Sequence, residues 1–163
     1  MTTKMTKVGY DEIMAEIDRL WTQERPEVVE EVHQAALLGD RSENAAYIYG
    51  KQRLRRIDSR LQFLRKKVKD VKVINTDFLS PRPDIQFGAL VYMEDEDEKQ
   101  HIIRLVDQNE SNPKTGRISI QSPIGRAIIG LEEGDAAEVK LPKGIVEYEI
   151  LKVHYGPDPR KDK

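Results

Sequence analysis

The chain of 163 residues contains no cysteine. Disulfides, thiolate zinc sites and a cysteine nucleophile are therefore excluded, and a reducing, cytoplasmic location is expected. No stretch approaches the roughly 20 apolar residues of a membrane helix, and the first nine residues lack the apolar centre of a signal peptide, so no membrane partner is expected. Aromatic residues make up 6% of the chain and charged residues 34%. This balance predicts that part of the chain is an elongated, solvated element.

Motifs of self-contained catalysis are also missing. The sequence has no glycine-rich phosphate loop and no serine elbow. Its three histidines, His33, His101 and His154, lie in separate segments, and without cysteine they do not predict a metal cluster. We therefore expect neither a cofactor of its own nor an enzyme that acts alone.

Charge is segregated along the chain although the net charge is only −2. Residues 11–44 carry ten acidic and three basic side chains, whereas residues 51–72 carry ten basic and two acidic ones. Blocks of opposite charge are typical of solvated helical faces that pair with each other. A basic face that attracts nucleic-acid phosphates is the alternative interpretation.

Apolar residues in both blocks recur at intervals of three, four and seven, which is the spacing of a coiled-coil seam. In the basic block these positions are Tyr47, Leu54, Ile57, Leu61, Leu64, Val68 and Val71. Pro26 interrupts the acidic block. Because proline has no amide donor, we expect a break or kink at residues 23–25, with Pro26 at the first position of the next helical piece.

A short connection separates the two helical blocks. Gly39 is suited to end the first helix, and Asp40 to cap the second with Glu43 as its capping-box partner. Helices joined by so short a turn run antiparallel. Residues 1–79 are therefore predicted to form an antiparallel α-helical coiled-coil hairpin. Its acidic tip lies at residues 39–47, and its second helix runs from about residue 44 to residue 72.

Residues 80–163 have a different texture and are predicted to form a second domain. After the stiff segment Ser80-Pro81-Arg82-Pro83, β-rich runs alternate with turns. The expected strands are 87–93, 102–106, 118–120, 137–141 and 145–153. Ser122 and Pro123 suit the cap and first position of one short helix. The predicted fold class is thus α+β, with a helical hairpin followed by a small antiparallel β domain.

Asp40 and Glu43 are the candidate chemical groups. A spacing of three places both carboxylates on one face of a starting helix, although caps with no further role are the simpler interpretation. Two carboxylates are too few to hold Mg²⁺ tightly, because this ion retains waters and requires further oxygens from other molecules. A tip that completes the metal site of a partner is the chemically sensible alternative.

Three segments resemble one known family. The runs Arg25–Val28, Gly39–Tyr47 (GDRSENAAY) and Ser122–Gly130 (SPIGRAIIG) are similar to those of the bacterial Gre transcript-cleavage factors. The resemblance extends from about Tyr10 to Tyr155. The dense basic second helix, the Arg-Ser pair in the tip and the Phe87-Gly88-Ala89 run resemble the GreB branch more than the GreA branch.

The resemblance implies a transcription elongation factor that binds bacterial RNA polymerase. It implies an FKBP-like C-terminal domain at the rim of the polymerase secondary channel and a helical finger that enters the channel. Asp40 and Glu43 match the family's tip acids, which help to hold a Mg²⁺ ion shared with the polymerase and so stimulate cleavage of backtracked RNA. The chain itself would be monomeric and would supply ligands in trans.

Further site residues follow from the same resemblance. Basic residues of the second helix would lie beside the extruded RNA 3′ end and attract phosphates without reading sequence; they include Lys51, Arg53, Arg56 and Arg60. Some of these charges must also pair with the acidic helix. The polymerase-docking residues would be Ser122, Pro123 and Ile124, a role compatible with helix capping.

Three other functions stay open at this point. A polymerase-binding antagonist would share the architecture but leave cleavage unstimulated. An RNA-binding hairpin acting through charge alone would bind RNA without polymerase and with a steep salt dependence. A freestanding metal nuclease would cut RNA in Mg²⁺ by itself.

Overall fold

The computed structural model describes residues 3–39 and 43–160. The chain forms two compact units, one comprising Tyr10–Val71 and the other Met1–Gly9 together with Lys72–Lys163. Helices dominate the first unit and a sheet dominates the second, so the fold class is α+β. Among the described residues, no helix combines the length and apolar character needed to cross a bilayer.

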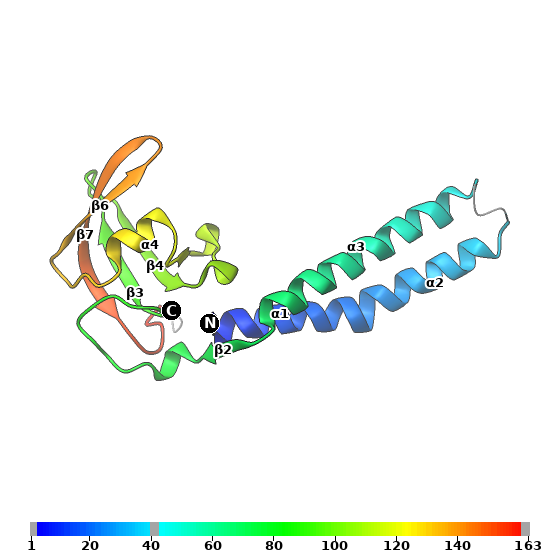
Figure 1. Ribbon diagram of the computed structural model, residues 1–163, viewed down its shortest axis with the longest axis horizontal. Helices are drawn as coiled ribbons and strands as arrows, with labels where there is room; N and C mark the ends of the chain where they lie inside the picture. Colours follow the sequence, from blue (N-terminus) through cyan, green and yellow to red (C-terminus); the bar gives the residue numbers. More distant parts are fainter. Residues whose placement is uncertain (1–2, 40–42, 161–163) are drawn as a thin grey trace. The chain divides into compact units, whose positions relative to one another are not determined.

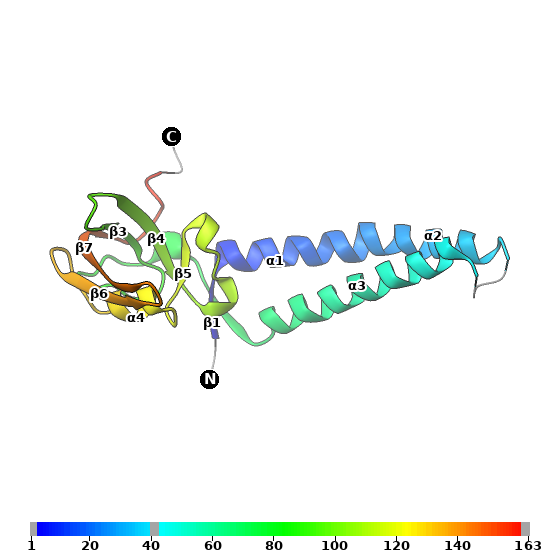
Figure 2. The same cartoon turned by 90° about the horizontal axis from the view of Figure 1, so that it is seen from above.

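The helical unit consists of two lines of helix packed side by side in opposite directions (Figures 1 and 2). The first line contains α1 (Lys7–Arg19), the π-helical segment η1 (Leu20–Glu24) and α2 (Arg25–Ala36), and the second is α3 (Ala45–Val68). The buried side chains between the two lines are Leu20, Val28, Ile57, Leu61 and Leu64. Gly50 permits the close approach, since a Cβ there would lie 2.7 Å from Val32 Cγ2. Three of the predicted seam positions are therefore buried in this contact.

The helix is irregular just before Pro26, as expected, but the irregularity is a π-helical segment and not a full break. Arg19, Glu24 and Arg25 all have right-handed helical dihedral angles, and the Arg25 amide donates to the carbonyl of Leu20, five residues earlier. This wider π-helical turn accommodates the proline ring, which would otherwise meet the preceding turn. Pro26 therefore lies in the first turn of α2 without interrupting the line of helix.

Helix α3 starts close to the predicted residue 44, but its cap is not the predicted one and it ends before the predicted residue 72. Its cap is Asn44, whose Oδ1 accepts from the Tyr47 amide at 3.0 Å and whose Nδ2 donates to Ala35 O at 2.6 Å. Asp40, the predicted cap, lies outside the described residues. The helix stops at Val68, and Asp70 has a positive φ of 58°. The β-branched run that begins at Val71 then forms strand β2 (Val71–Ile74), as such side chains favour.

Two sheets make up the second unit. Strand β1 (Thr3–Thr6) pairs with β2, and a five-stranded sheet has the order β5-β4-β3-β7-β6. Its strands are β3 (Leu90–Glu94), β4 (Gln100–Val106), β5 (Arg117–Ser119), β6 (Ala136–Leu141) and β7 (Gly144–His154). The single α-helix that follows β5 is α4 (Pro123–Ile128). All five expected strands and the short helix are therefore confirmed, with shifted ends.

One pairing contradicts the expectation of a wholly antiparallel sheet. Strand β5 runs parallel to β4, whereas the β3–β4, β3–β7 and β6–β7 pairs are antiparallel. Between β4 and β5 the chain forms two 3₁₀ turns, η3 (Gln108–Glu110) and η4 (Pro113–Thr115). These turns lead the chain back so that β5 starts beside the middle of β4. A third turn of this kind, η2 (Thr76–Phe78), follows β2.

The sheet unit also includes the first residues of the chain. The Glu110 side chain is buried and accepts from the amide and the hydroxyl of Thr6, which fastens the end of β1 to η3. Residues 1–9 and 72–79 thus belong to the sheet unit and not to the predicted helical domain 1–79. The β1–β2 pairing and this buried carboxylate explain the difference.

Candidate functional site

Glu43 lies in the turn that precedes α3, one residue before the Asn44 cap, and its side chain is exposed. Because Glu43 is not in the helix, the argument that helical spacing aligns two carboxylates does not apply to it. The free amides at the start of α3 favour a negative charge at this position. Its predicted partner, Asp40, lies outside the described residues, so their mutual geometry stays a prediction.

Residues 37 and 38, where the first line of helix ends, expose apolar side chains. Leu37 is 67% and Leu38 82% exposed.

Within residues 3–39 and 43–160, no group of three or more histidine or carboxylate side chains is placed to hold a metal ion. Glu43 offers carboxylate oxygens, the ligand type that Mg²⁺ prefers, but a complete site needs oxygens from elsewhere.

The four predicted RNA-contacting residues of α3 divide into two kinds. Arg53 forms an ion pair with Glu31 at 2.8 Å, and Arg60 binds both carboxylate oxygens of Glu16, at 2.7 and 3.0 Å. The hydrogen bond from Arg60 lowers the pKa of Glu16, and the same bond raises the pKa of Arg60. Two of the basic residues thus neutralise acids of the first line of helix.

The other two basic residues, Lys51 and Arg56, have no ion-pair partner in the described part of the chain. Arg56 is exposed and Lys51 is half-buried. Their charges are therefore available to an outside anion, whereas the charges of Arg53 and Arg60 are partly offset within the helical unit.

Aromatic rings accompany the cations of this unit. Arg53 Cζ lies 5.9 Å from the centre of the Tyr49 ring, and Arg60 Cζ lies 5.4 Å from that of Phe63. Both rings are exposed, Tyr49 by 58% and Phe63 by 48%. Sequence reasoning missed these two residues because it considered only the buried seam. The signal that could have revealed them is their spacing, at intervals of four and three residues, with the arginines that lie outside that seam.

The predicted docking residues lie at the start of α4. Ser122 caps this helix by accepting from the Gly125 amide at 3.0 Å, and its hydroxyl donates to Ser119 O at 2.6 Å. Pro123 is exposed and Ile124 is half-buried. Gly125 is required because a Cβ there would lie 2.0 Å from Ser119 O. The motif thus holds Pro123 at the surface in a rigid turn.

Ile124 also lines a pocket of about 520 Å³ on the sheet. Two other lining residues are His101 and Tyr148, whose rings meet edge to face with centres 5.7 Å apart. His101 Nε2 lies 2.9 Å from Asp95 Oδ2, and this hydrogen bond lowers the pKa of Asp95. Of the three predicted docking residues, Ile124 thus borders a partly apolar hollow.

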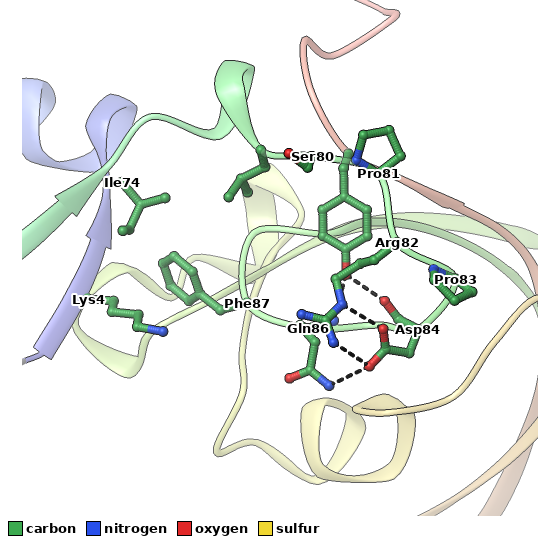
Figure 3. Close-up of a pocket in the computed structure, with 11 residues that line it drawn as sticks. Lys4, Ile74, Ser80, Pro81, Arg82, Pro83, Asp84, Gln86 and Phe87 are labelled. Atoms are coloured by element: carbon green, nitrogen blue, oxygen red, sulfur yellow. Dashed lines mark hydrogen bonds and ion pairs between the residues drawn. The ribbon is translucent and has the colours of Figure 1, made fainter.

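A hollow of about 690 Å³ in this unit lies along residues 79–87, which include the stiff segment predicted to link the two domains (Figure 3). The Tyr155 hydroxyl donates to Asp84 O at 2.6 Å and accepts from the Gln86 amide at 2.9 Å. Arg82 binds the Asp84 carboxylate, which lowers the pKa of Asp84, while burial raises the pKa of Tyr155. Residues 80–86 are therefore fastened to the end of the sheet, and no predicted site residue lines this hollow.

Comparison with known families decides how these elements are to be interpreted. Residues 3–73 match the family described as "Transcription elongation factor, N-terminal", and residues 80–155 match "Transcription elongation factor, GreA/GreB, C-term". The chain belongs to the GreA/GreB family. It is a transcription elongation factor of that family, and the two matched ranges cover both the helical unit and the five-stranded sheet.

Relatives of the Gre family cover most of the chain. Transcription elongation factor GreB of Yersinia pestis is 44% identical over 155 residues, which are 94% of this chain and 89% of the relative. GreB of Pseudomonas aeruginosa is 42% identical over 158 residues, 97% of this chain and 94% of the relative. These matches confirm the predicted GreB-type factor. GreA of Nitratiruptor sp. is nearly as similar, with 43% identity over 154 residues, 94% of this chain and 93% of the relative.

Among solved structures, the chain is similar to GreA factor homolog 1 (Gfh1) of Thermus thermophilus. The match has a TM-score of 0.43 and 25% identity and covers 94% of this chain and 99% of the other.

Proposed function

We propose that this chain binds bacterial RNA polymerase through the polymerase's secondary channel and stimulates the polymerase's intrinsic cleavage of backtracked RNA. Arrested complexes would thereby recover an RNA 3′ end from which synthesis resumes. The observation that carries the proposal is the tip sequence GDRSENAAY in a Gre-family chain, with the exposed carboxylate of Glu43 next to the Asn44 cap.

Asp40 and Glu43 would supply carboxylate ligands to a Mg²⁺ ion shared with the polymerase. The donor chemistry fits this role, since Mg²⁺ uses one or two protein carboxylates and completes its shell with water and phosphate oxygens. When bound, the ion would be one of the two metals of a two-metal hydrolysis, in which one ion activates the attacking water and the other stabilises the leaving oxygen. The chain would contribute the two carboxylates, of which that of Glu43 lies next to the Asn44 cap of α3, and the hydrolysis would belong to the polymerase.

The basic side of α3 would attract the extruded RNA. Arg56 and Lys51 carry charges that no described acid offsets, and phosphates bind such cations without regard to sequence. Arg53 and Arg60 would contribute less, because Glu31 and Glu16 already hold them. The helical unit would thus act as a coiled-coil finger with a phosphate-attracting side.

Ser122, Pro123 and Ile124 would form the polymerase-docking element. The support is the rigid turn that the Ser122 cap creates, which holds Pro123 at the surface. The resemblance to the Gre family implies an FKBP-like class for the sheet unit, and its five-stranded sheet with the short helix α4 supports that proposal. We also propose a monomeric, cytoplasmic factor.

A cleavage assay on stalled, backtracked polymerase tests the proposal. Adding the full chain should accelerate release of 3′ RNA fragments, and the variant Asp40→Asn/Glu43→Gln should bind polymerase equally well without accelerating release. A wild-type chain that binds and slows cleavage would instead identify the antagonist. Cleavage of RNA by the chain alone in Mg²⁺ would identify a nuclease.

A further inference from the structure

One side of α3 carries three arginines flanked by two aromatic residues. Tyr49, Arg53, Arg56, Arg60 and Phe63 follow one another at intervals of four, three, four and three residues. Residues at these intervals share a helix face. The buried positions of the same helix, Gly50, Ile57, Leu61 and Leu64, belong to a different face. The two rings therefore do not contribute to the core of the helical unit.

Each ring lies next to a cation of the same helix. Tyr49 is adjacent to the Arg53 guanidinium, and Phe63 lies 5.4 Å from Arg60 Cζ and 4.7 Å from Lys67 Nζ. Such contacts stabilise a cation beside a ring at the surface. An exposed ring can stack on a base, while a phosphate of the same strand binds a nearby cation whose charge no described acid offsets.

The spacing of the two rings suits a strand longer than one nucleotide. Tyr49 and Phe63 are separated by 14 residues, or roughly 21 Å along a helix. Arg56 lies midway, two turns from each ring, and has no ion-pair partner among the described residues. A single strand that follows this face would meet a ring, an available cation and a second ring in turn.

We propose that Tyr49 and Phe63 are base-stacking residues and that this face of α3 binds single-stranded RNA through its bases as well as its phosphates. The ligand is the extruded 3′ segment, so the inference rests on the proposed function. It differs from attraction by charge alone, because stacking requires a base and tolerates any sequence. The face binds one base at each ring and a phosphate at Arg56 between them.

Binding of fluorescent oligomers to the full chain tests this inference without polymerase. The probes are a uridine oligoribonucleotide and an abasic ribose-phosphate oligomer of equal length. Wild type should bind the uridine oligomer more tightly. Tyr49→Leu/Phe63→Leu should lose roughly 5- to 150-fold per stacked base with the uridine oligomer, and should bind the abasic oligomer as wild type does. The variant Tyr49→Phe/Phe63→Tyr keeps both rings and should retain the preference.

A matched control is Phe78→Leu, which removes an aromatic ring that is 83% exposed in the sheet unit. This variant should bind both oligomers as wild type does. Equal affinity of wild type for the two oligomers would overturn the inference, and so would an equal loss in Phe78→Leu. Neither result would alter the test of Asp40 and Glu43, which is read on polymerase, so the two proposals fail separately.

Discussion

Replacing the basic residues of α3 two at a time should distinguish their contribution to ion pairs within the helical unit from their contribution to RNA binding. Arg53→Gln/Arg60→Gln removes two cations that hold Glu31 and Glu16, and Lys51→Gln/Arg56→Gln removes two that hold no described acid. Both variants change the formal charge by −2. Any difference between them therefore reflects the partners of the lost cations and not the net charge.

The magnitudes follow from the exposure of the pairs. The side chains of Arg53 and Arg60 are 35% and 50% exposed, so each ion pair is worth about 0.2–1 kcal/mol. Losing both should cost about 1 kcal/mol, or ~4–8 °C of Tm in a unit of about 60 residues. Lys51→Gln/Arg56→Gln should leave the Tm unchanged or slightly raised, because it relieves repulsion within the basic block.

The binding of single-stranded RNA should show the opposite order. Each lost phosphate contact lowers the slope of log affinity against log salt by ~0.7, so Lys51→Gln/Arg56→Gln should lower it by ~1.4 and Arg53→Gln/Arg60→Gln by less. On backtracked polymerase, Lys51→Gln/Arg56→Gln should selectively depress the release of RNA fragments longer than dinucleotides. A Tm loss confined to Lys51→Gln/Arg56→Gln, with Arg53→Gln/Arg60→Gln as stable as wild type, would refute this division.

Three other expectations concern docking, metal and pH. Pro123→Glu should compete with wild type for polymerase at least tenfold more weakly, with an unchanged Tm. Ile124→Asp should weaken competition and also lower the Tm, since Ile124 is half-buried. Unchanged competition by both variants would show that this turn is not part of the interface. Calorimetry of the free chain should detect no micromolar Mg²⁺ binding, and finding it would contradict a shared site. The hydrogen bond from Arg160 lowers the pKa of Asp158 to about 2. This depressed pKa means that Asp158 stabilises the fold above the unfolded value of about 4 and loses that effect as pH falls towards 2. The Tm deficit of Asp158→Asn should therefore be full at pH 7 and shrink below pH 4, and a constant deficit would refute the pairing.

Local patterns predicted most of the fold. The four-and-three spacing of Ile57, Leu61 and Leu64 identified the buried side of α3, and the turn residues located all five strands. The Ser122 cap followed from its position before Pro123. Each of these features depends on residues that are close in the sequence. The sequence alone was therefore sufficient to predict them.

The errors arose where distant segments meet. The seam pattern continues to Val71, but pairing with β1 draws that residue into β2. The parallel alignment of β5 depends on two 3₁₀ turns between it and β4. The buried Glu110 joins η3 to Thr6, more than 100 residues away. No local pattern reports such contacts.

The candidate site was only partly predictable for the same reason. The charge count showed an excess of basic residues in residues 51–72. It could not show that Arg60 pairs with Glu16 while Arg56 pairs with no described acid. The exposed rings of Tyr49 and Phe63 became visible only once the buried face of α3 was known. The roles of Asp40 and Glu43 stay predictions that derive from the family's tip motif.

The Mg²⁺ dependence of RNA cleavage by backtracked polymerase tests the central claim most directly. Cleavage rates are measured across a Mg²⁺ titration without the factor, with wild type, and with Asp40→Asn or Glu43→Gln at saturating concentration. Wild type should raise the rate and lower the Mg²⁺ concentration that gives half-maximal cleavage, because two added carboxylates strengthen ligation. Each amide variant should shift that concentration back towards the factor-free value. Variants that keep the wild-type rate and Mg²⁺ dependence would contradict the assignment of these acids as ligands.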